Sequence, residues 1–163
     1  MKFVGAVPCR ATVCLTRKWQ PGEFNMARAA AISRSDRRGT SLSERGSVFV
    51  VDDDPSIRTS LNRLLREHGF AATLFDSAGA LLHHGSFDKA ICIVLDIDLN
   101  GRSGIDLRRQ LAEEGVTAPV IYITGNDSSA NRAAAVASGC IAYLVKPFTA
   151  QSLIESVARA SAA

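Results

Sequence analysis

Short apolar runs alternate with amphipathic stretches from residue 47 to the end of the chain. The runs occupy residues 48–51, 71–75, 90–96, 119–124 and 141–145. Each has the length of a strand, and a run that is apolar without interruption suits a strand buried on both faces. Between the runs, apolar residues recur at helical spacing, in helices predicted after Pro55, over 78–84, 105–114 and 128–138, and after Thr149. The alternation of five strands with five helices predicts an α/β fold, with a parallel sheet covered by helices on both sides.

Polar residues stand where the apolar runs end. They are Asp52 and Asp53 after the first run, Asp96 at the end of the third, Thr124 at the end of the fourth and Lys146 after the fifth. The carboxyl ends of parallel strands lie at one edge of the sheet, where sites form in such folds. We therefore expect these side chains to share one site.

Three converging carboxylates repel one another unless a cation joins them or one keeps its proton. Oxygen ligands of this kind favour Mg²⁺, which commonly bridges carboxylate and phosphate. Capping of the helix that starts at Pro55 is the alternative interpretation of the acidic run. Capping explains Asp54, but it does not explain Asp52 and Asp53 before it.

Lys146 and Thr124 would supply donors to the same site. Lys146 precedes Pro147, which suggests a fixed peptide bond, in the cis form as one option, that directs the ammonium inward toward Asp96. The Thr124 hydroxyl could donate to the same oxygens. Taken singly, each residue is also compatible with an ordinary surface lysine or strand-end threonine.

The net charge of +3 is unevenly distributed. Residues 1–46 carry the basic excess, whereas residues 47–163 have more acidic than basic side chains. We interpret residues 1–46 as a basic, disordered extension and residues 47–163 as the folded domain. A functional basic tail and a translation start at Met26 are both compatible with the extension. Since the folded part is not basic, we expect no direct DNA binding by it.

Several classes of protein are disfavoured by what the chain does not contain. No apolar run approaches the roughly 20 residues that cross a bilayer, and the start has no secretory signal pattern. A cytoplasmic protein with no membrane association is therefore expected. Cys92 and Cys140 are predicted to be small buried hydrophobes, and the spacing of Cys9 and Cys14 does not suit a zinc site.

Four segments together resemble a known family. VFVVDDDPSIR, IVLDIDLNGRSGIDL, VIYITG and AYLVKPF occur in this order and are similar to motifs of the response-regulator receiver domain of two-component signalling, and of its FixJ-like branch in particular. The resemblance covers about 115 residues, essentially everything after residue 46, and it implies a flavodoxin-like, doubly wound parallel sheet of five strands in the order 2-1-3-4-5.

The resemblance implies a role for each residue of the predicted site. Asp96 would accept a phosphoryl group as a carboxylate nucleophile. Asp53 would bind Mg²⁺ directly, Asp52 through water, and Asp98 through its backbone carbonyl. Thr124 would bond the phosphoryl group, Lys146 would neutralise its charge, and Tyr143 would be a switch aromatic that turns inward. Without the family, Tyr143 is equally a half-buried strand aromatic. The family often has Met–Pro after the acceptor loop's first residues, and the acidic Asp98 with Leu99 departs from this pattern.

The output of the domain is left open by the sequence. One hypothesis is a phosphorylation-controlled binding module that is not itself an enzyme. Its partners would be a sensor histidine kinase or a histidine phosphotransfer protein, an unknown target, or a second receiver in a homodimer, and it would act through the face of the fourth and fifth helices and fifth strand. The alternative is a fragment of a DNA-binding transcriptional regulator that has lost its output domain. A nucleotide-binding flavodoxin-like module would need a Gly-rich loop where Asp52 and Asp53 stand.

Overall fold

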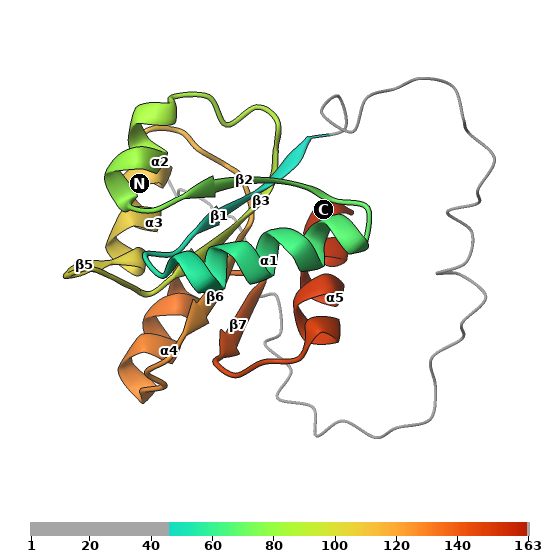
Figure 1. The fold of residues 1–163 in the computed structure, drawn as a ribbon. Coiled ribbons are helices and arrows are strands. Elements are labelled where there is room, and N and C mark those ends of the chain that lie inside the picture. Colours follow the sequence, from blue (N-terminus) through green and yellow to red (C-terminus); the bar gives the residue numbers. More distant parts are fainter. Residues whose placement is uncertain (1–45, 163) are drawn as a thin grey trace, which may run out of the picture. The chain divides into compact units, whose positions relative to one another are not determined.

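The computed structural model describes residues 46–162 of the chain, so the predictions for residues 1–45 lie outside it. Figure 1 shows the elements, which are β1 (Ser47–Val51), α1 (Pro55–Glu67), β2 (Ala71–Phe75), α2 (Ala78–His84), β3 (Ala90–Asp96), β4 (Asp98–Leu99), β5 (Arg102–Ser103), α3 (Gly104–Glu113), β6 (Val120–Thr124), α4 (Ser129–Ala137), β7 (Ala142–Val145) and α5 (Ala150–Ser161).

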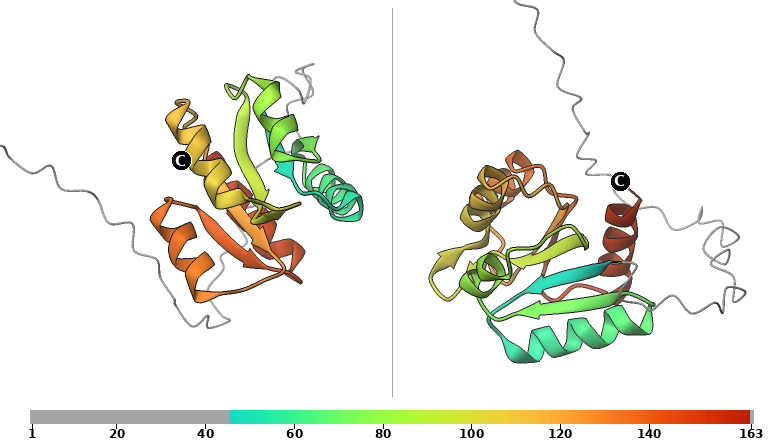
Figure 2. Two further views of the ribbon diagram at one scale, coloured as in Figure 1. Left: turned by 90° about the vertical axis from the view of Figure 1, so that its left-hand side faces the viewer. Right: turned by 90° about the horizontal axis from the view of Figure 1, so that it is seen from above.

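The main sheet has five parallel strands in the order β2-β1-β3-β6-β7, which confirms the predicted fold and strand order. Helices cover both faces, as Figure 2 shows. One core lies between the sheet and α1 and α5, and the other lies between the sheet and α2, α3 and α4. Alternate residues of β1 enter the two cores, with Val48 and Val50 in the first and Phe49 and Val51 in the second.

Strand register brings the acidic residues together. Val51 of β1 is paired with Leu95 of β3, so Asp52 and Asp96, the next residue of each chain segment, lie side by side. On the other side of β3, Asp96 is paired with Ile123, the residue before Thr124. The carboxyl ends of β1, β3 and β6 therefore meet at one edge.

A two-stranded antiparallel ribbon, β4–β5, follows β3 and was not predicted. It is too short to show periodicity, and its turn places Asn100 and Gly101 at positive φ angles of 46° and 85°. The ribbon delivers Ser103, which caps α3 by accepting hydrogen bonds from the amides of Ile105 and Asp106.

Cys92 and Cys140, which the sequence predicted to be buried, differ in burial. Cys92 is fully buried as predicted, and burial raises its pKa to about 12. Cys140 is only half-buried, because it follows the turn at Gly139 and precedes β7 at the edge of the sheet.

Within residues 46–162, no helix has both the length and the apolar character that crossing a bilayer requires.

Candidate functional site

Three carboxylates converge at the carboxyl edge of β1 and β3. Asp52, Asp53 and Asp96 each offer an oxygen, and these oxygens all lie within 4.8 Å of one another. Asp52 is fully buried, Asp96 is 5% exposed and Asp53 is half-buried. A buried cluster of like charges needs a positive partner. Asp53 is only half-buried, so a partner can approach its carboxylate from the solvent.

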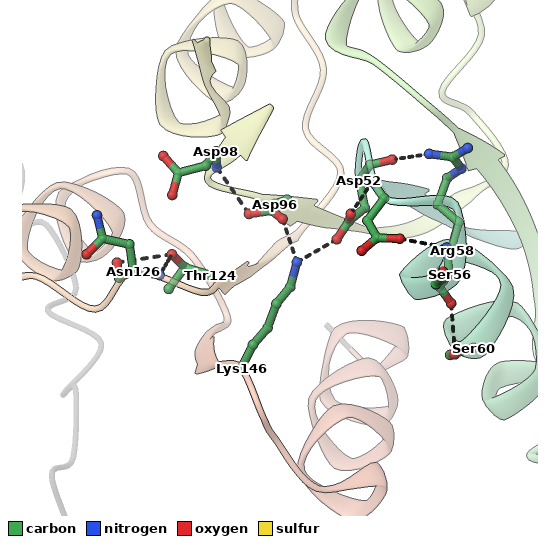
Figure 3. Close-up of polar contacts among 10 residues, drawn as sticks. Asp52, Ser56, Arg58, Ser60, Asp96, Asp98, Thr124, Asn126 and Lys146 are labelled. Atoms are coloured by element: carbon green, nitrogen blue, oxygen red, sulfur yellow. Dashed lines mark hydrogen bonds and ion pairs between the residues drawn. The ribbon is translucent and has the colours of Figure 1, made fainter. Parts of the chain in front are cut away.

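Lys146 supplies part of that positive charge. It follows β7, and the Lys146–Pro147 peptide bond is cis. Its Nζ donates hydrogen bonds to Asp52 Oδ2 at 2.7 Å and to Asp96 Oδ2 at 2.5 Å (Figure 3). The pair with Asp96 was expected from the sequence, whereas the second bond, to Asp52, was not.

The pKa values follow from this arrangement. Burial raises the pKa of Asp52, against the hydrogen bonds from Lys146 and from the Asp54 amide, which lower it. Burial alone would lower the pKa of Lys146, but its bonds to Asp52 and Asp96 outweigh burial, and the pKa is raised. Lys146 therefore remains charged, and its single ammonium bonds two of the three carboxylates, those of Asp52 and Asp96. The remaining negative charge favours a further cation at the site.

Backbone contacts fix the orientation of the acidic side chains. The Asp54 amide donates to Asp52 Oδ1 at 2.9 Å, and the Asp98 amide donates to Asp96 Oδ1 at 3.1 Å. Arg58 Nη1 donates to the Asp52 carbonyl at 2.7 Å and ties the end of β1 to α1. Arg58 was not predicted as part of the site, although its place one turn into the helix after the acidic run is a signal that could have indicated it.

Asp54 has the capping role that the sequence suggested. Its Oδ1 accepts a hydrogen bond from the Ser56 amide at 2.7 Å, with Pro55 at the first helical position. This amide hydrogen bond lowers the pKa of Asp54. Capping thus accounts for Asp54 and leaves Asp52 and Asp53 for the site.

Thr124 lies at the expected edge, but its hydroxyl does not bond Asp96. The side chain is fully buried, and Oγ1 donates to the Asn126 carbonyl at 3.1 Å and accepts from the Asn126 amide at 3.0 Å (Figure 3). Asp98 is exposed, and Figure 3 shows its carboxylate directed away from Lys146. These two side chains thus border the carboxylate cluster without joining its hydrogen bonds.

Tyr143 lies on β7, opposite Tyr122 of β6. The residue is half-buried against the core formed with α2, α3 and α4, and its hydroxyl is buried. The Arg132 guanidinium of α4 lies over its ring, 4.9 Å from the centroid. Burial, followed by the charge of Asp127, raises the pKa of Tyr143. Sequence reasoning suggested the aromatic position but not its contact with Arg132.

Comparison with known proteins matches this chain to a single family, through both a family model and individual relatives. The family model of the response regulator receiver domain matches residues 48–158. Nodulation protein W of Bradyrhizobium diazoefficiens is 38% identical over 132 residues, which are 78% of this chain and 58% of that protein. Transcriptional regulatory protein FixJ of the same organism is 34% identical over 121 residues, which are 72% of this chain and 59% of that protein.

Solved structures agree in fold. The response regulator receiver protein from Burkholderia phymatum is 38% identical, with a TM-score of 0.63, over 72% of this chain and 95% of that chain. The chain spans less than two thirds of the length of both relatives from Bradyrhizobium. The similarity therefore concerns the domain, not the remainder of those proteins.

Proposed function

This chain belongs to the response-regulator receiver domain family, and from that membership we propose that Asp96 accepts a phosphoryl group from a phosphohistidine. Receiver domains are signalling domains of two-component systems, and the proposal concerns the residues that perform this role here. The observation that carries it is the contact of Asp96 with Lys146 at 2.5 Å beside two further carboxylates. In the transfer, a carboxylate oxygen of Asp96 attacks phosphorus, and the P–N bond breaks. The imidazole nitrogen keeps the electron pair and takes up a proton.

The acidic cluster fits a magnesium ion. Carboxylate oxygens within 4.8 Å of one another are the ligands that this cation uses, and the charge of Asp52, Asp53 and Asp96 exceeds that of Lys146. We propose Asp53 as a direct ligand, Asp52 as a ligand through water, and the Asp98 backbone carbonyl as the third protein ligand. A bound cation would neutralise phosphoryl oxygens during transfer.

Lys146 and Thr124 would act on the transferred group. Lys146 already bonds the acceptor carboxylate, so a phosphoryl oxygen on Asp96 would come within reach of its ammonium. The Thr124 hydroxyl would exchange its bond to the Asn126 carbonyl for one to the phosphoryl group. Tyr143 would respond to this movement and change the face formed by α4, β7 and α5, which we propose as the surface for a target or a second receiver.

The phosphoacceptor role is tested with the full chain. Incubation with Mg²⁺ and acetyl phosphate should add the mass of one phosphoryl group, measured as intact mass, and chelation of Mg²⁺ should prevent the addition. Asp96→Asn keeps the size of the side chain and should abolish the addition. Replacement of the exposed Asp106 of α3 by Asn is the matched control and should leave it unchanged. Addition that survives in the Asp96→Asn protein would contradict the proposal.

Asp98 is expected to shorten the lifetime of the phosphorylated state. Its amide bonds Asp96 Oδ1, which fixes its backbone beside the acceptor, while its exposed carboxylate points away from Lys146. A change of side-chain rotamer would bring this carboxylate to the site, where it could orient an attacking water. A well-positioned base contributes at least about 100-fold. Because the Asp98 carboxylate is exposed, Asp98→Ala should slow loss of the phosphoryl group by no more than this factor. The half-life would be followed by intact mass after removal of the donor. Asp98→Asn separates charge from size, and equal half-lives in all three proteins would discard the idea.

The partners follow from the family. Receiver domains interact with histidine kinases or histidine phosphotransfer proteins, and we propose a donor of this class for Asp96. The two hypotheses for the output, a binding module and part of a DNA-binding regulator, both remain compatible with relatives that match over 58% and 59% of their length. Sequencing of the gene beyond the codon for Ala163 would separate them.

A further inference from the structure

The first turn of α4 is joined to both Thr124 and Tyr143 by side chains that no motif singled out. Arg132 pairs with Asp127 at 2.7 Å and lies over the Tyr143 ring at 4.9 Å. Asn131 Nδ2 donates to the Asn126 carbonyl at 3.3 Å, the same oxygen that accepts from Thr124 Oγ1. The side chains of Asn131 and Arg132 therefore link α4 to the loop after β6, in addition to the cap at Ser128, and Arg132 also links it to β7.

The Tyr143 ring depends on these contacts for its position. Its hydroxyl is buried close to Asp127 and Ser128, although no hydrogen bond of standard geometry reaches it within residues 46–162. The ring is positioned by packing against the core, by these two neighbours of its hydroxyl and by the guanidinium on its face. The ion pair with Asp127 fixes that guanidinium, although both side chains are partly exposed, at 53% and 40%.

We propose that Arg132 is a latch that holds Tyr143 in the conformation without a phosphoryl group. This inference rests on the proposed function, because it concerns the regulation of the same site. In the structure, Thr124 is bonded to Asn126 and not to Asp96, which is the arrangement expected before phosphorylation. A contact that is present in this conformation and lost when Tyr143 turns stabilises the resting state. Loss of the latch should therefore shift the population toward the activated state.

The latch predicts tighter binding of a phosphoryl analogue when Arg132 is removed. The probe is beryllofluoride with Mg²⁺, titrated calorimetrically into the full chain. Arg132→Ala should tighten its apparent Kd by about twofold to fivefold, the range expected for an exposed cation–π contact. Arg109→Ala removes an exposed ion pair to Asp106 on α3 and should leave the Kd unchanged.

Two further measurements separate a latch from a structural arginine. In a Tyr143→Leu background, Arg132→Ala should no longer change the Kd, since the ring that it holds is absent. The ring signals of Tyr143 in NMR spectra without the probe should shift and sharpen in Arg132→Ala but not in Arg109→Ala. Unchanged ring signals, or a Kd equal to that of the parent, would overturn the latch. A parent protein that binds no beryllofluoride would contradict the proposed function, and the ring signals would still decide on the latch.

Discussion

Gly104→Ala is expected to destabilise the domain by about 3 kcal/mol, the upper end of what overpacking usually costs. Gly104 begins α3, and a Cβ at this position would lie 2.1 Å from the Asp96 carbonyl oxygen and 3.2 Å from Ile97 Cα. Both neighbours are backbone atoms, so no flexible side chain can move aside. The Gly104 amide also donates to the Ile97 carbonyl at 2.8 Å, which fixes the close approach. The free energy of unfolding in urea measures the effect.

The same substitution should impair phosphoryl uptake, because relief of the clash displaces the end of β3 that carries Asp96. Gly79→Ala is the matched control. Gly79 lies in α2, and a Cβ there would meet no atom within 4 Å. Alanine favours a helix interior over glycine by about 1 kcal/mol, and Gly79 is the second residue of α2, so Gly79→Ala should stabilise the domain by less than this amount and leave uptake unchanged. If both variants lose stability equally, the close approach at Gly104 is not the cause.

The sequence predicted the sheet because its signal is local. The three central strands β1, β3 and β6 are almost continuous apolar runs, and the predicted bounds differ from those of β1, β6 and β7 by one residue at most. The alternation of elements predicted a parallel sheet, and the strand order followed from the resemblance. The ribbon β4–β5 could not be predicted, since two residues a strand give no period.

Residues of the site that stand at strand ends were predicted, whereas its contacts with helices and loops were not, and the difference has a physical reason. Asp52, Asp96 and Lys146 stand at strand ends, and strand ends share an edge whatever the side chains do. Contacts between helices and loops have no such rule. The approach of Gly104 to the Asp96 carbonyl and the stacking of Arg132 on Tyr143 depend on tertiary packing, so single-sequence patterns did not indicate them.

Lys146→Met should lower the free energy of unfolding at neutral pH by roughly 3 kcal/mol in the absence of divalent cations, the lower limit for a buried pair that loses one partner. The Lys146 side chain is 21% exposed, whereas the Asp52 side chain is fully buried and the Asp96 side chain is 7% exposed. Removal leaves two buried carboxylates beside each other with no cation. Lys89→Met is the matched control, because Lys89 is exposed and no ion pair involves its side chain among the described residues.

The deficit of Lys146→Met should depend on pH in a defined direction. Burial already raises the pKa of Asp52 in the folded state, and loss of Lys146 removes two influences that lower it. A carboxyl with a raised folded pKa contributes stability that is complete below its unfolded pKa and is lost as pH rises through the folded pKa. The variant should therefore approach the stability of the parent as pH falls from neutral to mildly acidic values, where Asp52 takes up its proton. Mg²⁺ at neutral pH should also recover part of the deficit, since it replaces the missing positive charge.

Both effects are measured by urea unfolding across this pH range, with and without Mg²⁺. If the difference in free energy of unfolding between Lys146→Met and the parent stays constant with pH, lost packing of the lysine stem, and not lost charge, causes the difference.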